Sequence, residues 1–270
     1  MTRNIIQFTK MHGIGNDFVV INSLNQTIDM KKLSIPQLAN RHVGIGFDQL
    51  LLIERSHHSA DFFCRIYNSD GSEAEQCGNG LRCVARYIHE EGIHANKLFS
   101  IETKAGIFPL EIHDYDRIRV SMGAPEIINN LVELTLPDQP SILPMSILSI
   151  GNPHAITKVE SLEATPVNIL APKISMHSLF PNGVNIGFMQ IINQNHIRLR
   201  TFERGAGETF ACGSNACAAA VAGITNGWLN EHVKVDFVYG SLEILWEGKD
   251  KPIHMTGPAS KVYSGKFEVI

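Results

Sequence analysis

Short runs of apolar and β-branched residues, several of them alternating with polar residues, occur along the whole chain. Runs of this kind bounded by Asn, Gly, Asp or Pro are typical of strands, and the alternation is typical of half-buried antiparallel strands. They cover residues 18–21, 50–53, 62–67, 117–120, 186–192, 196–202, 233–237 and 242–246. The pattern therefore predicts a chain built mainly of short strands.

Two segments follow a helical period instead. Residues 79–91 carry an apolar stripe at Leu81, Val84, Ala85 and Ile88 and stop at a glycine. Residues 214–226 are apolar almost all round and are also followed by a glycine, so this second helix should lie inside the molecule. A shorter helix is expected over 34–42, where a serine and a proline suit the first turn.

An internal repeat relates the two long helices. Residues 62–92 align with 197–227 at a constant offset of 135, and a weaker echo relates 45–49 to 186–190. The matched positions include Arg65 and Arg200, Tyr67 and Phe202, Glu73 and Glu208, and Cys77-Gly78 and Cys212-Gly213. A duplicated unit of this length is domain-sized. We therefore expect an α+β fold of two pseudo-symmetric halves, 1–121 and 122–261, each a curved, mainly antiparallel, barrel-like sheet around a central helix.

Composition narrows the classes of protein to which this chain could belong. The chain has 270 residues, 44% of them hydrophobic, and a net charge of −4 without a basic block, which argues against a nucleic-acid or anionic-membrane partner. The first ten residues lack the apolar region of a signal peptide, and no apolar run reaches the ~18 residues of a membrane span. Five cysteines without framework spacing indicate free thiols in a reducing compartment, so a cytoplasmic location is expected.

Two of the five cysteines stand directly before the predicted helices. A thiol at a helix N-terminus lies at the positive end of the helix dipole, which lowers its pKa and favours the reactive thiolate. Cys77 and Cys212 occupy this position. Cys64, Cys83 and Cys217 fall inside a strand or a helix, where inert buried thiols are common, and are expected to be structural.

The same helix starts suit an anion. Backbone N–H groups at Gly78, Asn79, Gly213 and Ser214 are free to bind a carboxylate. If both helix ends held one carboxylate, a thiolate on one face of the neighbouring carbon could remove its proton and a thiol on the other face could return one, which inverts the centre. The two thiols would then titrate as a coupled pair.

The repeat is broken where Asn68-Ser69 in the first half align with Glu203-Arg204 in the second. Unlike residues at equivalent positions are expected to recognise the rest of a substrate. Arg204 suits a second carboxylate and Glu203 an ammonium group, with a surface ion pair as the less favoured alternative. His154 alone reads equally as a loop histidine or a catalytic one.

Several stretches resemble the diaminopimelate epimerase family, cofactor-independent epimerases of lysine and cell-wall biosynthesis. They cover residues 10–18, 44–49, 70–80, 151–154, 184–188 and 203–213, with both cysteine motifs among them. The resemblance implies interconversion of LL- and meso-diaminopimelate with Cys77 and Cys212 as the two bases. It also implies no cofactor and no metal, pseudo-symmetric barrels, and a C-terminal strand, 262–270, that returns to the first half.

The resemblance assigns further roles residue by residue. His154 and Glu203 would tune the thiols, and Tyr263 falls on a position of the family's homodimer interface. The substrate would be held by Asn16, Gln49, Asn68, Asn152, Asn185, Glu203 and Arg204, and its reacting carboxylate by Gly78, Asn79, Gly213 and Ser214. One departure is Asn215, which replaces a usual glycine; its side chain could crowd the carboxylate pocket, but activity is expected to survive the change.

Three alternatives remain open from the sequence. A two-cysteine racemase or epimerase of the proline or hydroxyproline type would share the architecture, but its substrate lacks a second charged end for Glu203 and Arg204. A metal-binding or redox module would usually separate its cysteines by two to four residues, whereas five residues lie between Cys77 and Cys83. A non-catalytic homologue that only binds an amino acid is the third.

Overall fold

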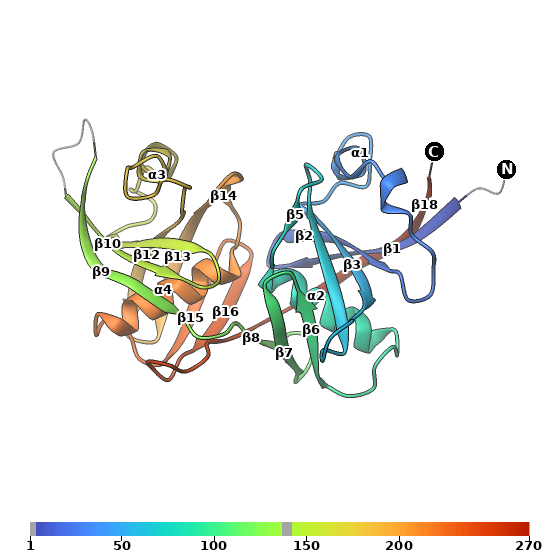
Figure 1. Cartoon of the computed structure of the whole chain (residues 1–270). Coiled ribbons are helices and arrows are strands. Elements are labelled where there is room, and N and C mark those ends of the chain that lie inside the picture. The colour runs from blue at the N-terminus through green and yellow to red at the C-terminus, as the bar shows by residue number, and fades with distance from the viewer. Residues whose placement is uncertain (1–3, 137–141, 270) are drawn as a thin grey trace. The chain divides into compact units, whose positions relative to one another are not determined.

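The computed structural model describes residues 4–136 and 142–269, which form two compact units (Figure 1). The first unit comprises the described residues up to Val120 together with those from Gly257 onward, and the second comprises Ser121 to Thr256. The outermost residues of the expected halves, 1–3 and 270, lie outside the described part of the chain, as do residues 137–141.

The first unit is built mainly of strands. Its short helices are η1 (Met30–Lys32) and α1 (Ile35–Ala39), and its long helix is α2 (Gly78–Glu90). Its strands are β1 (Asn4–Gly13), β2 (Asn16–Asn22), β3 (Gln49–Arg55), β4 (Phe62–Asn68), β5 (Glu73–Ala74), β6 (Leu98–Thr103), β7 (Gly106–Ile112), β8 (Ile118–Ser121) and, from the C-terminus, β18 (Ser260–Val269).

The second unit repeats this plan. Its helices are α3 (Val167–Ser175) and α4 (Gly213–Thr225). Its strands are β9 (Glu126–Thr135), β10 (Ile142–Ser149), β11 (Pro153–Lys158), β12 (Asn185–Asn193), β13 (His196–Glu203), β14 (Gly207–Thr209), β15 (His232–Phe237), β16 (Gly240–Leu245) and β17 (His254–Gly257).

Strand pairing follows the same order in both units. In the first, β1 is antiparallel to β2, β2 parallel to β3, β3 antiparallel to β4, and β4 parallel to β6. In the second, β10, β11, β12, β13 and β15 have the same sequence of directions. The flanking strand comes from β9 in the second unit but from the C-terminal β18 in the first. The predicted α+β fold of two pseudo-symmetric, curved, mainly antiparallel halves is confirmed.

The repeated residues have a structural role in each unit. Arg65 pairs with Glu73 at 3.1 Å, and Arg200 pairs with Glu208 at 2.7 Å, so that one ion pair ties the central antiparallel strand to the short strand after it in both units. The sequence identities at the 135-residue offset thus preserve one cross-strand contact.

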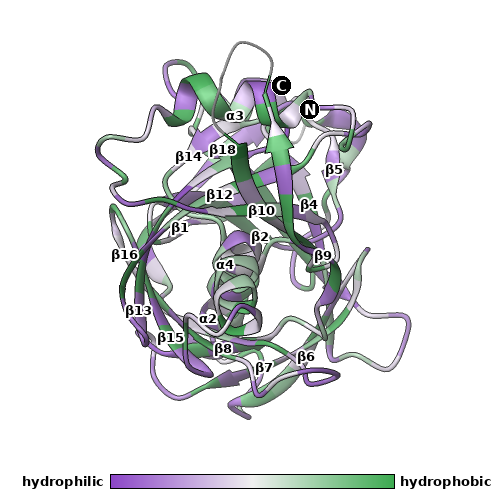
Figure 2. Cartoon of the chain, turned by 90° about the vertical axis from the view of Figure 1, so that its left-hand side faces the viewer, coloured by the Kyte–Doolittle hydropathy of each residue, from purple (hydrophilic) through white to green (hydrophobic). Residues whose placement is uncertain are grey.

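The long helices form the centre of each core. Every residue of α4 from Gly213 to Gly223 is buried, as its apolar composition predicts. In Figure 2 its ribbon runs inside the ring of strands of its own unit. Helix α2 buries Gly78 to Ala85 and Ile88, and leaves its last turn partly exposed.

Each predicted strand falls on an observed one, and the two long helices begin and end within one residue of expectation. Helix α1 is shorter than the expected 34–42, because the chain turns after Ala39. The pattern missed α3, whose first and sixth residues are Val167 and Pro172 and which follows Pro166. Proline normally interrupts helices, so this segment does not read as one.

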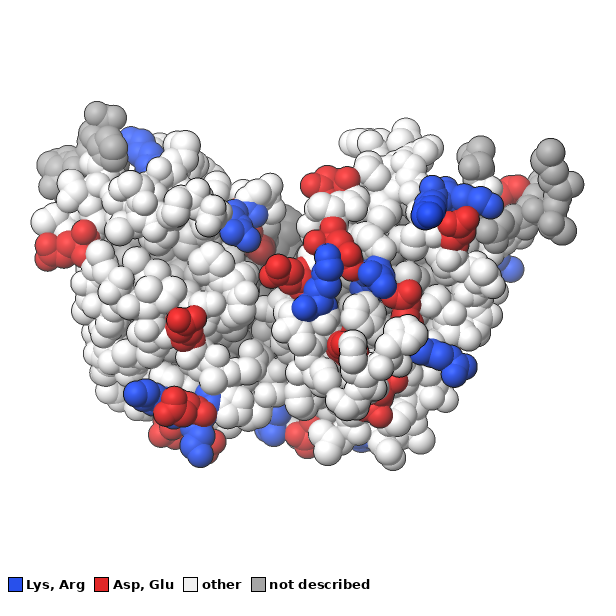
Figure 3. Space-filling model, in the orientation of Figure 1, with Lys and Arg blue, Asp and Glu red and all other residues white. Residues whose placement is uncertain are grey.

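The surface carries charges of both signs side by side. On the face shown in Figure 3, Lys and Arg lie next to Asp and Glu instead of forming a broad patch of one sign. Within the described residues, no helix has the length and apolar character that a membrane span requires.

Candidate active site

Cys77 and Cys212 are the N-cap residues of α2 and α4. Both have extended backbone conformations, with φ and ψ of −150° and 105° for Cys77 and −128° and 118° for Cys212, and each is followed by a 13-residue helix that opens on glycine. The first N–H groups of a helix have no partner within it. Each thiol therefore lies beside N–H donors that have no partner within the helix, at the positive end of a helix dipole.

The Cys77 thiol is half-buried and meets both a donor and an acceptor. Its Sγ accepts a hydrogen bond from the Gly80 N–H at 3.4 Å. On another side the thiol donates to Asn16 Oδ1 at 3.7 Å, and Asn79 Nδ2 donates to the same oxygen at 3.3 Å. Asn16 and Asn79, both predicted to bind substrate, thus lie at the cysteine.

Gln49 and Asn68 lie at the same edge of the first unit's sheet as Asn16. Asn16 opens β2 and Gln49 opens the parallel strand β3, while Asn68 ends the antiparallel strand β4 directly opposite Gln49. Gln49 Nε2 donates to Asn68 Oδ1 at 2.9 Å, and Asn68 Nδ2 donates to Ser72 Oγ at 3.0 Å. Strand polarity alone gathers these amides at one edge.

Cys212 is more deeply enclosed, with 7% of its surface exposed, and its Sγ lies 3.4 Å from Ser214 Oγ. Burial raises the pKa of this thiol well above its ordinary value, and the nearby negative charge of Glu203 raises it further. The expected lowering of the Cys212 pKa by the helix N-terminus is therefore wrong in this structure. Burying the thiolate away from water raises the pKa by more than the helix N-terminus and the hydrogen bond from Ser214 lower it.

Asn185, Glu203 and Arg204 lie together in the second unit. Asn185 Oδ1 accepts from the Arg204 backbone N–H at 3.0 Å, and its Nδ2 donates to the Pro153 carbonyl at 3.2 Å. The Arg204 guanidinium donates to the Asn182 carbonyl at 3.1 Å. Glu203 ends β13, and its Oε1 accepts from Thr209 Oγ1 at 2.5 Å.

His154 lies on β11 in register with Asn185 on β12 and is fully buried. Burial lowers the pKa of His154 to about 3, so its imidazole is neutral near pH 7. Its Nε2 lies 2.9 Å from Asn152 Oδ1, which places two more of the expected site residues in contact.

The remaining cysteines are buried. Burial raises the pKa of Cys83 to about 12 and that of Cys64 further, so both stay protonated at neutral pH. Cys217 lies inside α4. Among the residues with described positions, no three or more His, Cys, Asp or Glu side chains are grouped so that they could hold a metal ion.

Asn215 does not point where the sequence suggested. Its side chain is fully buried and directed into the sheet, where Nδ2 donates to the Ile186 carbonyl at 2.9 Å and to Thr201 Oγ1 at 2.5 Å. Crowding at the helix start is therefore not observed. Space for the amide exists because position 187 is glycine: a Cβ there would come within 2.6 Å of Asn215 Oδ1.

Three residues around the site were missed from the sequence. Asp48 accepts a hydrogen bond from the Asn16 side chain. Arg82 donates to the Asn79 side chain, and Thr209 donates to Glu203. Asp48 and Thr209 lie within stretches that carried the family resemblance, but no chemistry was assigned to them. Arg82 offered a signal of its own, as a basic residue one turn into an otherwise buried helix.

Comparison with solved structures shows which fold this chain has. A hydroxyproline epimerase from Agrobacterium vitis has a TM-score of 0.75 at 14% identity, covering 98% of this chain and 93% of that one. A phenazine biosynthesis protein of the PhzF family from Bacillus anthracis has a TM-score of 0.74 at 19% identity, covering 98% and 99%. The chain thus has the two-unit fold shared by these proteins and by a probable proline racemase from Agrobacterium radiobacter.

Sequence comparison is more specific. The diaminopimelate epimerase family model matches residues 8–128 and 146–262. Proteins named diaminopimelate epimerase from Nitrosospira multiformis and Nitrosomonas eutropha are each 46% identical to this chain, over 98% of it and 99% of their own length. The chain belongs to the diaminopimelate epimerase family.

Proposed function

We propose that the protein interconverts LL- and meso-diaminopimelate by proton transfer at the α-carbon, without a cofactor, within lysine and peptidoglycan precursor biosynthesis in the cytoplasm. The observation that carries the proposal is the repeated N-cap cysteine: each unit places one thiol at the start of its buried central helix. The family membership supplies the substrate.

The chemistry requires the two thiols to serve one carbon. The thiolate of one cysteine removes the α-proton, and the negative charge that develops spreads into the neighbouring carboxylate. Backbone N–H groups of Gly78, Asn79, Gly213 and Ser214 would stabilise that charge as they would any anion at a helix N-terminus. The thiol of the other cysteine then delivers a proton to the opposite face.

The reverse reaction exchanges the two roles, so neither cysteine should be permanently ionised or permanently protonated. The buried Cys212, whose pKa is raised by burial and by Glu203, provides the stronger base once its proton is lost. Buried, neutral His154 adds no positive charge that would fix a thiolate. We assign His154 and Glu203 to tuning the thiols.

The non-reacting end of the substrate carries its own ammonium and carboxylate. Asn16, Gln49 and Asn68 offer amides on the first unit, and Asn152 and Asn185 offer amides on the second. Arg204 provides the charge for a carboxylate, and Glu203 can receive an ammonium group. Proline and hydroxyproline lack this second charged end, which favours diaminopimelate over the substrates of the structural relatives.

An epimerisation assay tests the function. Purified protein under reducing conditions, without pyridoxal phosphate or added metal, should convert LL-diaminopimelate to a mixture with the meso form and leave proline and hydroxyproline unchanged. Racemisation of proline instead would favour the rival substrate class. Binding of diaminopimelate without turnover would favour a non-catalytic homologue.

We also propose a homodimer that uses the face around Tyr263. This ring on β18 is 46% exposed and packs edge-on against Phe8 at 5.9 Å, and the neighbouring Val262 is 55% exposed. Light scattering should give twice the mass of 29.9 kDa, and Tyr263→Ala should shift it toward the monomer. A wild-type monomer at micromolar concentration would contradict this assignment.

A further inference from the structure

Two amide side chains beside Cys77 have their orientation determined by what lies beyond them. Asn79 Oδ1 accepts from Arg82 at 2.9 Å, and Asn79 Nδ2 donates to Asn16 Oδ1. Asn16 Nδ2 in turn donates to Asp48 Oδ2 at 2.9 Å. A guanidinium can only donate and a carboxylate can only accept. Neither amide can flip without placing two donors or two acceptors face to face.

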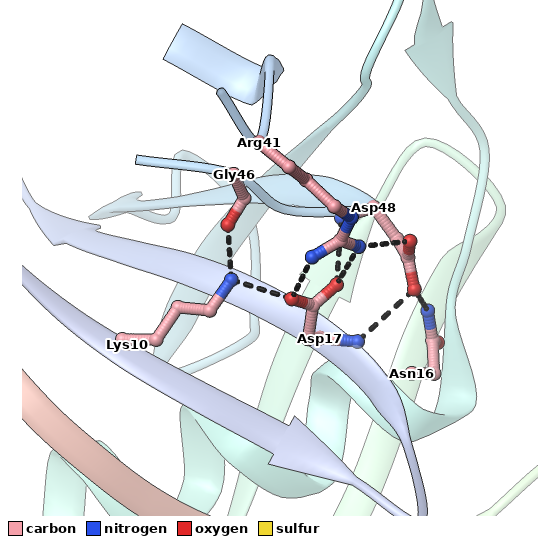
Figure 4. Close-up of polar contacts among 6 residues, drawn as sticks. All are labelled: Lys10, Asn16, Asp17, Arg41, Gly46 and Asp48. Carbon is pink, nitrogen blue, oxygen red and sulfur yellow. Dashed lines mark hydrogen bonds and ion pairs between the residues drawn. The ribbon is translucent and has the colours of Figure 1, made fainter. Parts of the chain in front are cut away.

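The Asp48 carboxylate is itself firmly held (Figure 4). Arg41 donates to Asp48 Oδ1 at 2.9 Å, and the Asp17 backbone N–H donates to its Oδ2 at 3.1 Å. Arg41 also binds both oxygens of Asp17 at 2.8 Å, and Lys10 donates to Asp17 and to the Gly46 carbonyl. Asp48 thus contacts Asn16, Asp17 and Arg41 directly, and Asp17 links it to Lys10.

Asp17 keeps this network charged. Burial alone would raise the pKa of Asp17, but hydrogen bonds and charge from Arg41 and Lys10 outweigh burial and lower that pKa to about 2. The carboxylate therefore remains an acceptor for Arg41 throughout the neutral range. Arg41, which also donates to Asp48, is thereby held in place by Asp17 over that range.

The orientation of Asn16 determines which of its atoms faces the sulfur of Cys77. With Asn16 oriented in this way, a carbonyl oxygen and not an NH₂ group faces Cys77 Sγ, so this contact favours the protonated thiol. The helix N-terminus and the Gly80 N–H favour the thiolate. Titratable groups near Cys77 include the buried, protonated thiols of Cys64 and Cys83, and the Arg82 guanidinium lies beyond Asn79.

We propose that Asp48 is a positioning residue that turns the carbonyl of Asn16 toward Cys77 and so keeps the thiol form accessible at a helix end that would otherwise favour permanent ionisation. The inference rests on the proposed function, because a reversible two-base reaction needs each cysteine as acid in one direction and base in the other. Asp48 acts through Asn16 and has no part in the proton transfer itself.

Alkylation of Cys77 tests the proposal without substrate. In a Cys212→Ser background the rate of reaction with iodoacetamide is followed at the Cys77 peptide by mass spectrometry as a function of pH. Asp48→Asn removes the carboxylate that fixes Asn16 and leaves only the longer hydrogen bond from Asn79, at 3.3 Å, to orient it. Asn16 can then turn its NH₂ group toward the thiol part of the time, so the midpoint of the profile should fall, by up to roughly one pH unit. Asp48→Glu keeps an acceptor and should restore the wild-type midpoint.

Asp48→Asn also removes a negative charge, which alone would lower the midpoint. Asn16→Ala separates the two effects, because it retains Asp48 and its network but removes the carbonyl acceptor; it should also lower the midpoint. Asp61→Asn is the matched control, since Asp61 also accepts hydrogen bonds, from Ser100 at 2.7 and 2.9 Å, but takes no part in this network, and it should leave the midpoint unchanged.

Two results of the alkylation experiment would contradict the role of Asp48. An unchanged midpoint in folded Asp48→Asn, or a shift there without one in Asn16→Ala, would overturn the proposal. If Asp48→Asn does not fold, an unchanged midpoint in Asn16→Ala still overturns the proposal. Because no turnover is measured, the proposal can fail while epimerisation persists, and it can hold in a protein that proves inactive toward diaminopimelate.

Discussion

Asn215 shows how the two units fill one equivalent position in different ways. In the first unit a glycine at the third helical position, Gly80, packs on Leu51, whose methyl carbons lie 3.1 and 3.2 Å from where a Cβ would stand. In the second unit the side chain comes from the helix and the glycine from the strand, with Asn215 over Gly187. The local sequence offers an unusual residue, but only the facing strand explains why it fits.

This complementarity predicts a coupled pair of mutations. Gly187→Ala should destabilise the protein by about 2 kcal/mol, because the new methyl group meets Asn215 Oδ1 and Ile156 Cδ1. Asn215→Gly should cost a similar amount through lost hydrogen bonds and a cavity. The double variant should cost less than the sum of the two in urea unfolding. Strict additivity would contradict the proposed contact, and exposed Asn230→Ala serves as the neutral control.

Buried His154 predicts a dependence of stability on pH. Burial depresses its pKa to about 3 in the folded state, against about 6.5 when unfolded, so below pH 6.5 only the unfolded chain takes up this proton. Stability is therefore fully present above pH 6.5 and falls by about 1.4 kcal/mol per pH unit as the pH drops toward 3.

Comparison of His154→Gln with the wild type isolates that contribution. The difference in unfolding free energy between the two proteins should change with pH between 6 and 4.5, whereas exposed His57→Gln should leave the wild-type slope intact. Equal slopes for the wild type and His154→Gln would show that the imidazole is not held neutral.

At the scale of elements, the parts that sequence predicts well are those with local signals. Helices α2 and α4 carry an N-cap cysteine, a helical apolar pattern and a glycine just past the end, Gly92 and Gly227, both with positive φ. Helix α3 follows one proline and contains another, and it lacks such a signal. The family resemblance suggested the return of the C-terminal strand, whereas its register with β1 depends on contacts between residues some 250 positions apart.

Strand β18 gives a prediction of its own. It pairs with β1 from Asn4 to His12 and holds Phe8 under Tyr263 and Phe267. Ending the chain before Ser260 should leave β1 with an open edge, so its amides that are bonded to β18 should exchange with deuterium much faster. Ending the chain after Glu268 is the control. Unchanged protection of β1 in the shorter chain would contradict a structural role for β18.

In the candidate active site, too, only the residues with a local signal could be predicted from the sequence. Cys77 and Cys212 were found from sequence because each stands at a helix start, and the repeat links them. The network from Arg82 through Asn79 and Asn16 to Asp48 could not be found, because it pairs donors and acceptors between separate segments. The raised pKa of Cys212 was also out of reach, since it depends on how deeply the fold encloses the sulfur.

For the whole molecule, the expectation that two thiols serve one carbon predicts an oxidation product. Mild oxidation without substrate should join Cys77 to Cys212 and inactivate the protein, with dithiothreitol restoring activity, while the other three buried cysteines stay reduced. Peptide mapping identifies the linked pair. Complete inactivation with both peptides free would count against the two thiols facing each other.

The two-base reaction requires both N-cap cysteines, one from each unit, for turnover. Cys77→Ala and Cys212→Ala should each lower kcat by about a thousandfold or more, because each removes an acid in one direction and a base in the other. Cys83→Ala, which changes a buried thiol on the same helix as Cys77, should leave kcat near that of the wild type. Near-normal turnover by either of the first two variants would exclude a two-base reaction.

The most direct test of the central claim is hydrogen exchange at the α-carbon in D₂O. Wild-type protein under reducing conditions, with LL-diaminopimelate and no added cofactor, should form meso product that carries one deuterium at the inverted centre, since the α-proton goes to one cysteine and the deuteron that replaces it comes from the other, solvent-exchanged thiol. Folded protein that leaves the α-carbon unlabelled, or that inverts it with the original hydrogen retained, would contradict the two-thiol reaction.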